Sequence, residues 1–109
     1  MELKDIKAVY FVGAGGIGMS ALARYFLHRH LVVAGYDRTP TPLTHELERE
    51  GMQIHYEEDV DKIPASCRDR EHTLVVFTPA IPASHAELAW FKEHDFTIEK
   101  RAQVLGTLT

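Results

Sequence analysis

The chain has 109 residues, 45% of them hydrophobic, which suits one small globular domain. Its formal charge is −4 with acidic and basic residues interspersed, which argues against a nucleic-acid-binding protein with its usual basic face. The single cysteine, Cys67, excludes an internal disulfide, and the sequence shows neither a signal peptide nor an apolar run of the ~20 residues that span a bilayer. We therefore expect a soluble, cytoplasmic protein.

The first half of the chain alternates strand-like and helix-like segments. Apolar side chains recur at three- and four-residue spacing in the first helical segment. Thr41 before Pro42 predicts a second helix start, with Leu43 and Leu47 buried and Gly51 as its left-handed end. The predicted elements are a strand over 7–12, a helix over 16–27, a strand over 31–36, a helix from Pro42 and a strand over 52–56.

The second half continues the alternation after a polar, irregular stretch over 57–70, in which one helical turn is expected near 59–63. The clearest strand of the chain covers 73–77 and leads into residues 78–82, which two prolines keep from being helical. Ser84 is the expected cap of a helix through His94. A brief strand over 96–98 and a helix over 100–108 complete the pattern.

This order of elements is typical of a parallel, doubly wound sheet. We predict a single α/β domain with a Rossmann-like, doubly wound parallel sheet of about five strands, covering residues 1–109.

The turn Gly13-Ala14-Gly15-Gly16-Ile17-Gly18 carries the main functional signal, because a GxGxxG motif here follows a strand and opens a helix. Gly13 permits a tight turn, Gly15 allows close backbone approach to a diphosphate, and Gly18 allows helix and strand to pack. The unpaired amides and the dipole of the helix N-terminus favour an anion. A glycine-rich turn that binds nothing is the alternative.

Two further segments lie where a nucleotide is expected. Asp37 ends the second strand at about the ~20-residue distance at which an acidic side chain accepts ribose hydroxyls, although it also suits a solvated strand end. Residues 78–81 follow a strand at its carboxyl end, where open α/β sheets bind ligands, and they also suit an ordinary connection.

Other chemistry finds no support in the sequence. The seven histidines lack zinc-site spacing, so surface or capping roles are the better interpretation. Cys67 has no catalytic motif around it, and no GxxxxGK loop followed by serine or threonine occurs.

The segments FVGAGGIGMSALA (11–23), VAGYD (33–37), LVVFTPAIP (74–82) and KRAQVLG (100–106) closely resemble the N-terminal domain of the UDP-N-acetylmuramate–L-alanine ligases, a Mur ligase family. The resemblance covers nearly the whole chain in the same order. It implies that the 109 residues are the N-terminal domain of a longer ligase with an ATP-binding central domain and a C-terminal domain. The whole enzyme would use ATP and Mg²⁺ to activate the muramyl carboxylate, which L-alanine then attacks.

The resemblance also implies site residues, since this domain of the family binds the UDP part of UDP-N-acetylmuramate. The glycine turn would hold the diphosphate, Asp37 would lie beside the uridine, and Arg38 would stack on the uracil. Residues 78–81 and Arg101 would close around the nucleotide and its phosphates. The implied residues are Gly13, Ala14, Gly15, Gly16, Ile17, Gly18, Asp37, Arg38, Thr78, Pro79, Ala80, Ile81 and Arg101.

The chain departs from the family pattern at three places. His30 stands where a glycine usually ends the first helix, and Tyr36 replaces a common serine. Glu57-Glu58 falls where many relatives carry Gly-His near the nucleobase. From the residues alone, a nicotinamide-dinucleotide domain and a purely structural interaction domain remain alternatives.

Overall fold

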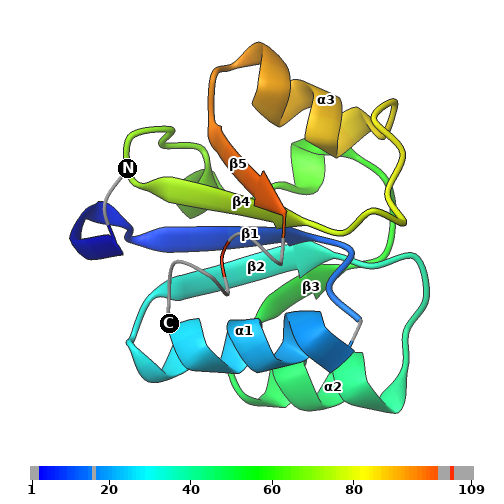
Figure 1. The fold of residues 1–109 in the computed structure, drawn as a ribbon. Coiled ribbons are helices and arrows are strands. Elements are labelled where there is room, and N and C mark those ends of the chain that lie inside the picture. The colour runs from blue at the N-terminus through cyan, green and yellow to red at the C-terminus, as the bar shows by residue number, and fades with distance from the viewer. Residues whose placement is uncertain (1–2, 16, 101–103, 105–109) are drawn as a thin grey trace.

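The computed structural model describes residues 3–15, 17–100 and 104. A central sheet is covered by α1 and α2 on one face and by α3 on the other (Figure 1). The helices are α1 (Ile17–His28), α2 (Pro42–Arg49) and α3 (Ala86–Glu93), and the strands are β1 (Ala8–Val12), β2 (Val32–Tyr36), β3 (Gln53–His55), β4 (Thr73–Phe77) and β5 (Thr97–Lys100). Short 3₁₀ turns are η1 (Leu3–Asp5), η2 (Val60–Lys62) and η3 (Ala65–Cys67).

The five strands are all parallel and lie in the order β3-β2-β1-β4-β5, which confirms the predicted doubly wound sheet. The chain moves outward from β1 through β2 to β3, and then returns to place β4 on the other side of β1. Between β1 and β4 the winding direction therefore reverses. In open sheets of this kind, ligands bind at such a reversal, outside the carboxyl ends of the strands.

Two hydrophobic clusters hold the layers together, one on each face of the sheet. All five residues of β1 are buried, and their side chains alternate between the faces. Val9 and Phe11 belong to the cluster under α1 and α2, whereas Tyr10 and Val12 belong to the cluster under α3. Because β1 is packed on both sides, the turn that follows it starts from a firmly held position.

Several predicted element ends differ from the observed ones by one or two residues, and two of these differences have a clear physical cause. Ser84 does not cap α3: the His85 N–H donates to the Pro82 carbonyl at 3.0 Å in a turn, so the helix starts one residue later and His85 is the cap. The fifth strand extends to Lys100, because its pairing with β4 continues to Phe77. Of the helix expected over 100–108, residues 101–103 and 105–108 lie outside the described residues, and Val104 is helical and buried.

The backbone is left-handed after α1 and after α2, at the positions where the sequence suggested it. Gly51 has φ 116°, a conformation that glycine adopts without strain. His30 follows α1 with φ 63°, so the position where the family usually has glycine does require a left-handed backbone. The stretch 57–70 contains two short 3₁₀ turns, where one helical turn was expected.

The start of α2 is a reciprocal cap. The Thr41 hydroxyl oxygen accepts from the Thr44 N–H at 3.1 Å, and the Thr41 N–H donates to the Thr44 hydroxyl oxygen at 2.9 Å. Pro42 takes the first helical position, where a missing N–H costs nothing. This cap anchors the segment that leaves β2.

We expect Thr41→Ala to lower the free energy of unfolding by about 1 kcal/mol, because a Thr44 N–H at the helix start loses its acceptor. Thr41→Ser keeps the hydroxyl and is the matched control. Urea unfolding followed by circular dichroism measures both, and equal stability of the two variants would contradict the role of the cap.

Cys67 is a structural residue of the core under α3. Its side chain is completely buried, and this burial raises the pKa of the thiol to about 11. A thiol with so high a pKa carries little thiolate near neutral pH and is a poor nucleophile. The structure thus agrees with the absence of a catalytic motif around this residue.

Cys67 should react with Ellman's reagent at pH 8 on the order of a hundredfold more slowly in the folded chain than in urea, where its pKa returns to ~8.5. Because the folded pKa is the higher one, the neutral thiol stabilises the fold fully below the unfolded pKa, and this contribution is lost as pH rises through about 11. Equal rates in the two states would contradict the burial.

Candidate functional site

The glycine turn leaves β1 and bends over the end of β2. Gly13 has φ 96°, and the N–H groups of Gly13 and Ala14 both donate to the Tyr36 carbonyl at 2.8 Å. Few residues other than glycine adopt such a backbone conformation, so Gly13 has the predicted conformational role. The two amides are engaged within the fold, and α1 starts at Ile17 directly behind the turn.

Asp37 lies against the glycine turn. A carbon added as Cβ at Gly15 would stand 1.9 Å from Asp37 Oδ2, so the absence of a side chain at Gly15 makes room for this carboxylate. The other carboxylate oxygen, Oδ1, accepts from the Thr39 N–H at 3.2 Å. The end of β2 and the turn after β1 therefore form one continuous surface with an acidic group at its centre.

The loop after β4 meets the glycine turn from the other side. A carbon added at Gly13 would stand 3.3 Å from the Thr78 hydroxyl oxygen and 3.4 Å from Ile81 Cγ1. Within the loop, the Ile81 N–H donates to the Thr78 carbonyl at 3.1 Å. The sheet order thus brings together two segments that are far apart in the sequence, at the reversal between β1 and β4.

These segments enclose a cavity of about 440 Å³, which we call the turn cavity. It is lined by Gly13, Gly15, Asp37, Arg38, Thr39, Thr41, Thr78, Ala80 and Ile81. Seven of these belong to the set predicted from the sequence. Of the other predicted residues, Ala14, Gly18 and Pro79 are not among the lining residues, while Gly16, the Ile17 side chain and Arg101 lie outside the described part of the chain.

Sequence reasoning missed two wall residues of the turn cavity, Thr39 and Thr41. Thr41 was assigned a capping role alone. A signal for both was available, because they directly follow Asp37 and Arg38 on the segment that leaves the carboxyl end of β2.

A second cavity of about 320 Å³, the side cavity, adjoins the first and shares Arg38, Ala80 and Ile81 with it. Its other lining residues are Tyr36, Glu58, Pro82 and His85. Tyr36 and Glu58 are two of the positions at which the chain departs from the family pattern. Burial, followed by the charge of Glu58, raises the pKa of the Tyr36 hydroxyl.

The wall of the side cavity rests on a buried carboxylate, Glu87, in the first turn of α3. Glu87 is completely buried and accepts from the Tyr10 hydroxyl, from His55 Nε2 at 2.9 Å and from the Asp59 N–H at 3.1 Å. Burial, and then the charge of Glu87, raises the pKa of Tyr10, which therefore stays protonated and donating. A buried carboxylate is tolerated only when it is so fully hydrogen-bonded.

A second carboxylate, that of Glu58, bonds in the opposite direction, from the segment before η2 to the start of α3. Glu58 Oε2 accepts from the Ala86 N–H at 2.9 Å, while Glu87 accepts from the N–H of Asp59, the neighbour of Glu58. The segment before η2 and the start of α3 therefore hold each other through two reciprocal bonds. This fixes the position of His85 relative to Glu58.

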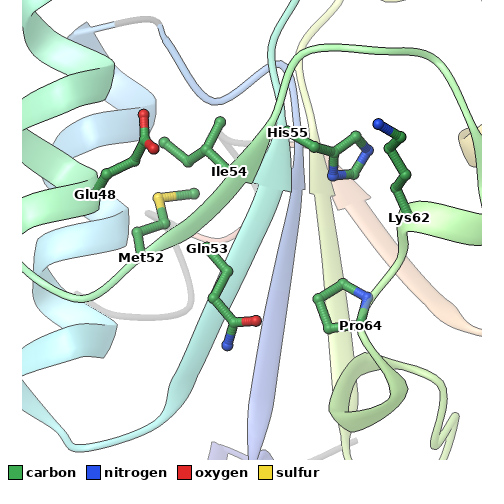
Figure 2. A pocket seen from close by; sticks show the side chains of 7 residues that line it. All are labelled: Glu48, Met52, Gln53, Ile54, His55, Lys62 and Pro64. Atoms are coloured by element: carbon green, nitrogen blue, oxygen red, sulfur yellow. The ribbon is translucent and has the colours of Figure 1, made fainter.

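A further groove of about 310 Å³ follows the outer strand β3. Figure 2 shows His55, Lys62 and Pro64 on one side of this strand and Glu48, Met52 and Ile54 on the other. Lys62 Nζ is paired with Glu57 at 2.9 Å, and His55 is bonded to Glu87. The groove lies away from the strand-end reversal, so the turn cavity and the side cavity together are the candidate site.

Among the residues that the structure describes, no three His, Cys, Asp or Glu side chains gather as metal ligands. None of the helices in the described part of the chain has both the length and the apolar character needed to cross a membrane.

Known proteins resemble this chain throughout its length. UDP-N-acetylmuramate–L-alanine ligases from Parabacteroides distasonis and Phocaeicola vulgatus are 55% and 56% identical over all 109 residues, which are 24% of each relative. The chain thus spans about a quarter of the length of the curated relatives it matches.

Solved structures share the fold. A UDP-N-acetylmuramate-alanine ligase from Thermotoga maritima matches with a TM-score of 0.79 at 28% identity, over 90% of this chain and 21% of that one. A murein peptide ligase from Psychrobacter arcticus matches with a TM-score of 0.76 at 21% identity, over 91% of this chain and 20% of that one, which shows the likeness of fold alone. The profile described as Mur ligase family, catalytic domain, matches residues 8–109, and the chain belongs to this family.

Proposed function

We propose that this chain binds the UDP moiety of UDP-N-acetylmuramate, as part of an ATP-dependent ligase that joins L-alanine to this substrate in the cytoplasm during peptidoglycan precursor synthesis. The observation that carries the proposal is the turn cavity, where the glycine turn, Asp37 and the loop after β4 meet at the sheet reversal. The choice of substrate is supported by the names of relatives that are 55% and 56% identical to the whole chain.

The proposed diphosphate position is the mouth of the glycine turn, in front of α1. Helix N-termini favour anions because their first amides lack partners within the helix and the helix dipole is positive there. The amides of Gly13 and Ala14 already serve the Tyr36 carbonyl, so we expect the diphosphate contacts from amides further along the turn. Arg38 lines both cavities, so its charge favours the diphosphate and its guanidinium would stack on the uracil, as the resemblance implies.

Asp37 has a different task from the amides. A carboxylate repels a diphosphate and accepts hydrogen bonds from hydroxyls, so its proposed partners are the ribose hydroxyls. Because Asp37 lies against Gly15, the ribose would lie beside the turn. Thr78 and Ile81 would cover the nucleotide from the loop after β4.

The chain would bind and orient one end of the substrate. The resemblance assigns ATP and Mg²⁺, which supply the chemistry that activates the muramyl carboxylate, to the longer enzyme. This chain would bind the UDP moiety in a fixed position and so hold the substrate while its other end reacts.

A calorimetric titration of the chain with UDP-N-acetylmuramate and, separately, with NAD⁺ tests the proposal. We expect saturable, one-to-one binding of the UDP-sugar and none of the dinucleotide at equal concentration. The opposite preference would identify a nicotinamide-dinucleotide domain, and binding of neither would leave the glycine turn without the proposed ligand.

Gly15→Val should abolish this binding, because the new side chain collides with the Asp37 carboxylate and blocks close approach to the turn. The carboxylate ends a flexible side chain and can move, so we expect the variant to fold. The control is Gly51→Ala, which strains the left-handed backbone at the far end of α2 but lies outside both cavities, so it separates a loss of stability from a loss of binding. Normal affinity in a folded Gly15→Val variant would show that the diphosphate lies elsewhere.

A further inference from the structure

His85 has a buried hydrogen-bond donor that the fold itself does not satisfy. The residue is 5% exposed, and its Nδ1 accepts from the Glu87 N–H at 3.2 Å. A ring nitrogen that accepts carries no proton, so the proton of the neutral ring is on Nε2. Among the residues that the structure describes, Nε2 has no hydrogen-bond partner. Buried donors in native proteins are nearly always paired, so we expect an acceptor on a bound ligand to pair with His85 Nε2–H.

Glu58 lies over this donor and provides the complementary group. Its Oε1 is 3.6 Å from His85 Nε2, too far for a hydrogen bond, while Oε2 accepts from the Ala86 N–H. The Glu58 side chain is 46% exposed, so its free end can shift when a ligand enters. The side cavity therefore presents one donor and one acceptor next to each other.

The rest of the side cavity suits a flat ring. Tyr36, Ile81 and Pro82 line it with largely apolar surface, and the ring of Tyr36 lies 4.7 Å from that of His85 between centroids. The cavity shares Arg38, Ala80 and Ile81 with the turn cavity. A nucleotide whose diphosphate occupies the glycine turn can therefore place its base here.

We propose that His85 and Glu58 determine the base specificity of the bound nucleotide by reading the edge of uracil; this inference rests on the proposed function. The C4 carbonyl of uracil accepts from His85 Nε2–H, and the adjacent N3–H donates to the Glu58 carboxylate. Cytosine presents an amino group at position 4 and an acceptor at position 3, which reverses this order. The ribose fixes the direction of the ring, so the reversed order leaves both protein groups unpaired.

Hydrogen bonds of Glu87 and Glu58 hold the start of α3 and the segment before η2 together. Glu87 holds both Asp59 and the Nδ1 side of His85, and Glu58 holds the Ala86 N–H. The His85 ring is thus positioned before the ligand arrives, and only the free end of Glu58 has to move. Such pre-organisation lowers the cost of ordering on binding.

Titration calorimetry of the chain with UDP and with CDP tests the inference. The wild type should prefer UDP by at least about tenfold, because a buried polar pair left unpaired is costly. His85→Asn keeps an oxygen that caps α3 and removes the Nε2 donor, so its preference should fall to within about threefold. His85→Gln is the matched control: its amide N–H replaces the donor, so the preference should persist even if the loss of the cap lowers Tm.

A preference for UDP retained in His85→Asn would overturn the inference, and its loss in His85→Gln alone would indicate a capping role only. Equal losses in the two variants would also overturn it, because His85→Gln restores the donor. Equal binding of UDP and CDP by the wild type would overturn it while leaving the UDP-site proposal in place. Binding of neither nucleotide would contradict both.

A measurement on the wild type needs no variant to fold. Long-range ¹H–¹⁵N spectra should show the His85 ring protonated at Nε2, with that nitrogen shifting on addition of UDP and not of CDP. A proton on Nδ1, or no shift with UDP, would overturn the inference.

Discussion

The Tyr36 carbonyl is the group on which the geometry of the site depends. It accepts from two successive amides, those of Gly13 and Ala14, and so ties the exit of β1 to the exit of β2. This bond pair pulls the glycine turn across the strand ends and leaves Gly15 facing Asp37. Without it, the acidic group and the turn would belong to separate loops.

A second constraint organises the opposite wall. Glu87 carries a charge into the core under α3, where its hydrogen bonds come from β1, from β3 and from the segment before η2. The partners on β1 and β3 connect this wall to the sheet. A buried, fully bonded carboxylate specifies one arrangement of its surroundings, since any other arrangement would leave the charge unpaired. The two walls of the site are therefore held by polar bonds, while the layers are held by apolar packing.

Most of the fold could be predicted from the sequence because its signals are local. Apolar runs ending at glycine or proline marked β1 and β4, and Thr41-Pro42 marked the start of α2. The cap of α3 was predicted one residue too early, because the turn from Pro82 to His85 depends on a backbone bond that no side-chain pattern announces.

The candidate site was predicted in part, for the same reason. Gly13, Gly15 and Asp37 form a motif with a known spacing, and the loop at Thr78 was recognised from its place after a strand. The roles of Glu87 and His85 could not be assigned from the sequence, because they depend on contacts with residues far away along the chain. From the sequence, Glu58 was only a departure from the family pattern. The structure shows that its carboxylate has a structural role, because it accepts from the Ala86 N–H.

The sheet order also governs when the site comes into existence during folding. β1 pairs with β4, Ala8 with Thr73, although more than half of the chain separates them. Such a contact closes a long loop and forms late relative to local structure. The glycine turn and its neighbours on β2 can assemble early, but the cavity gains its Thr78 wall only when β4 docks. A ligand that needs both walls therefore binds only the completed domain, and its occupancy reports on the folding of the whole chain.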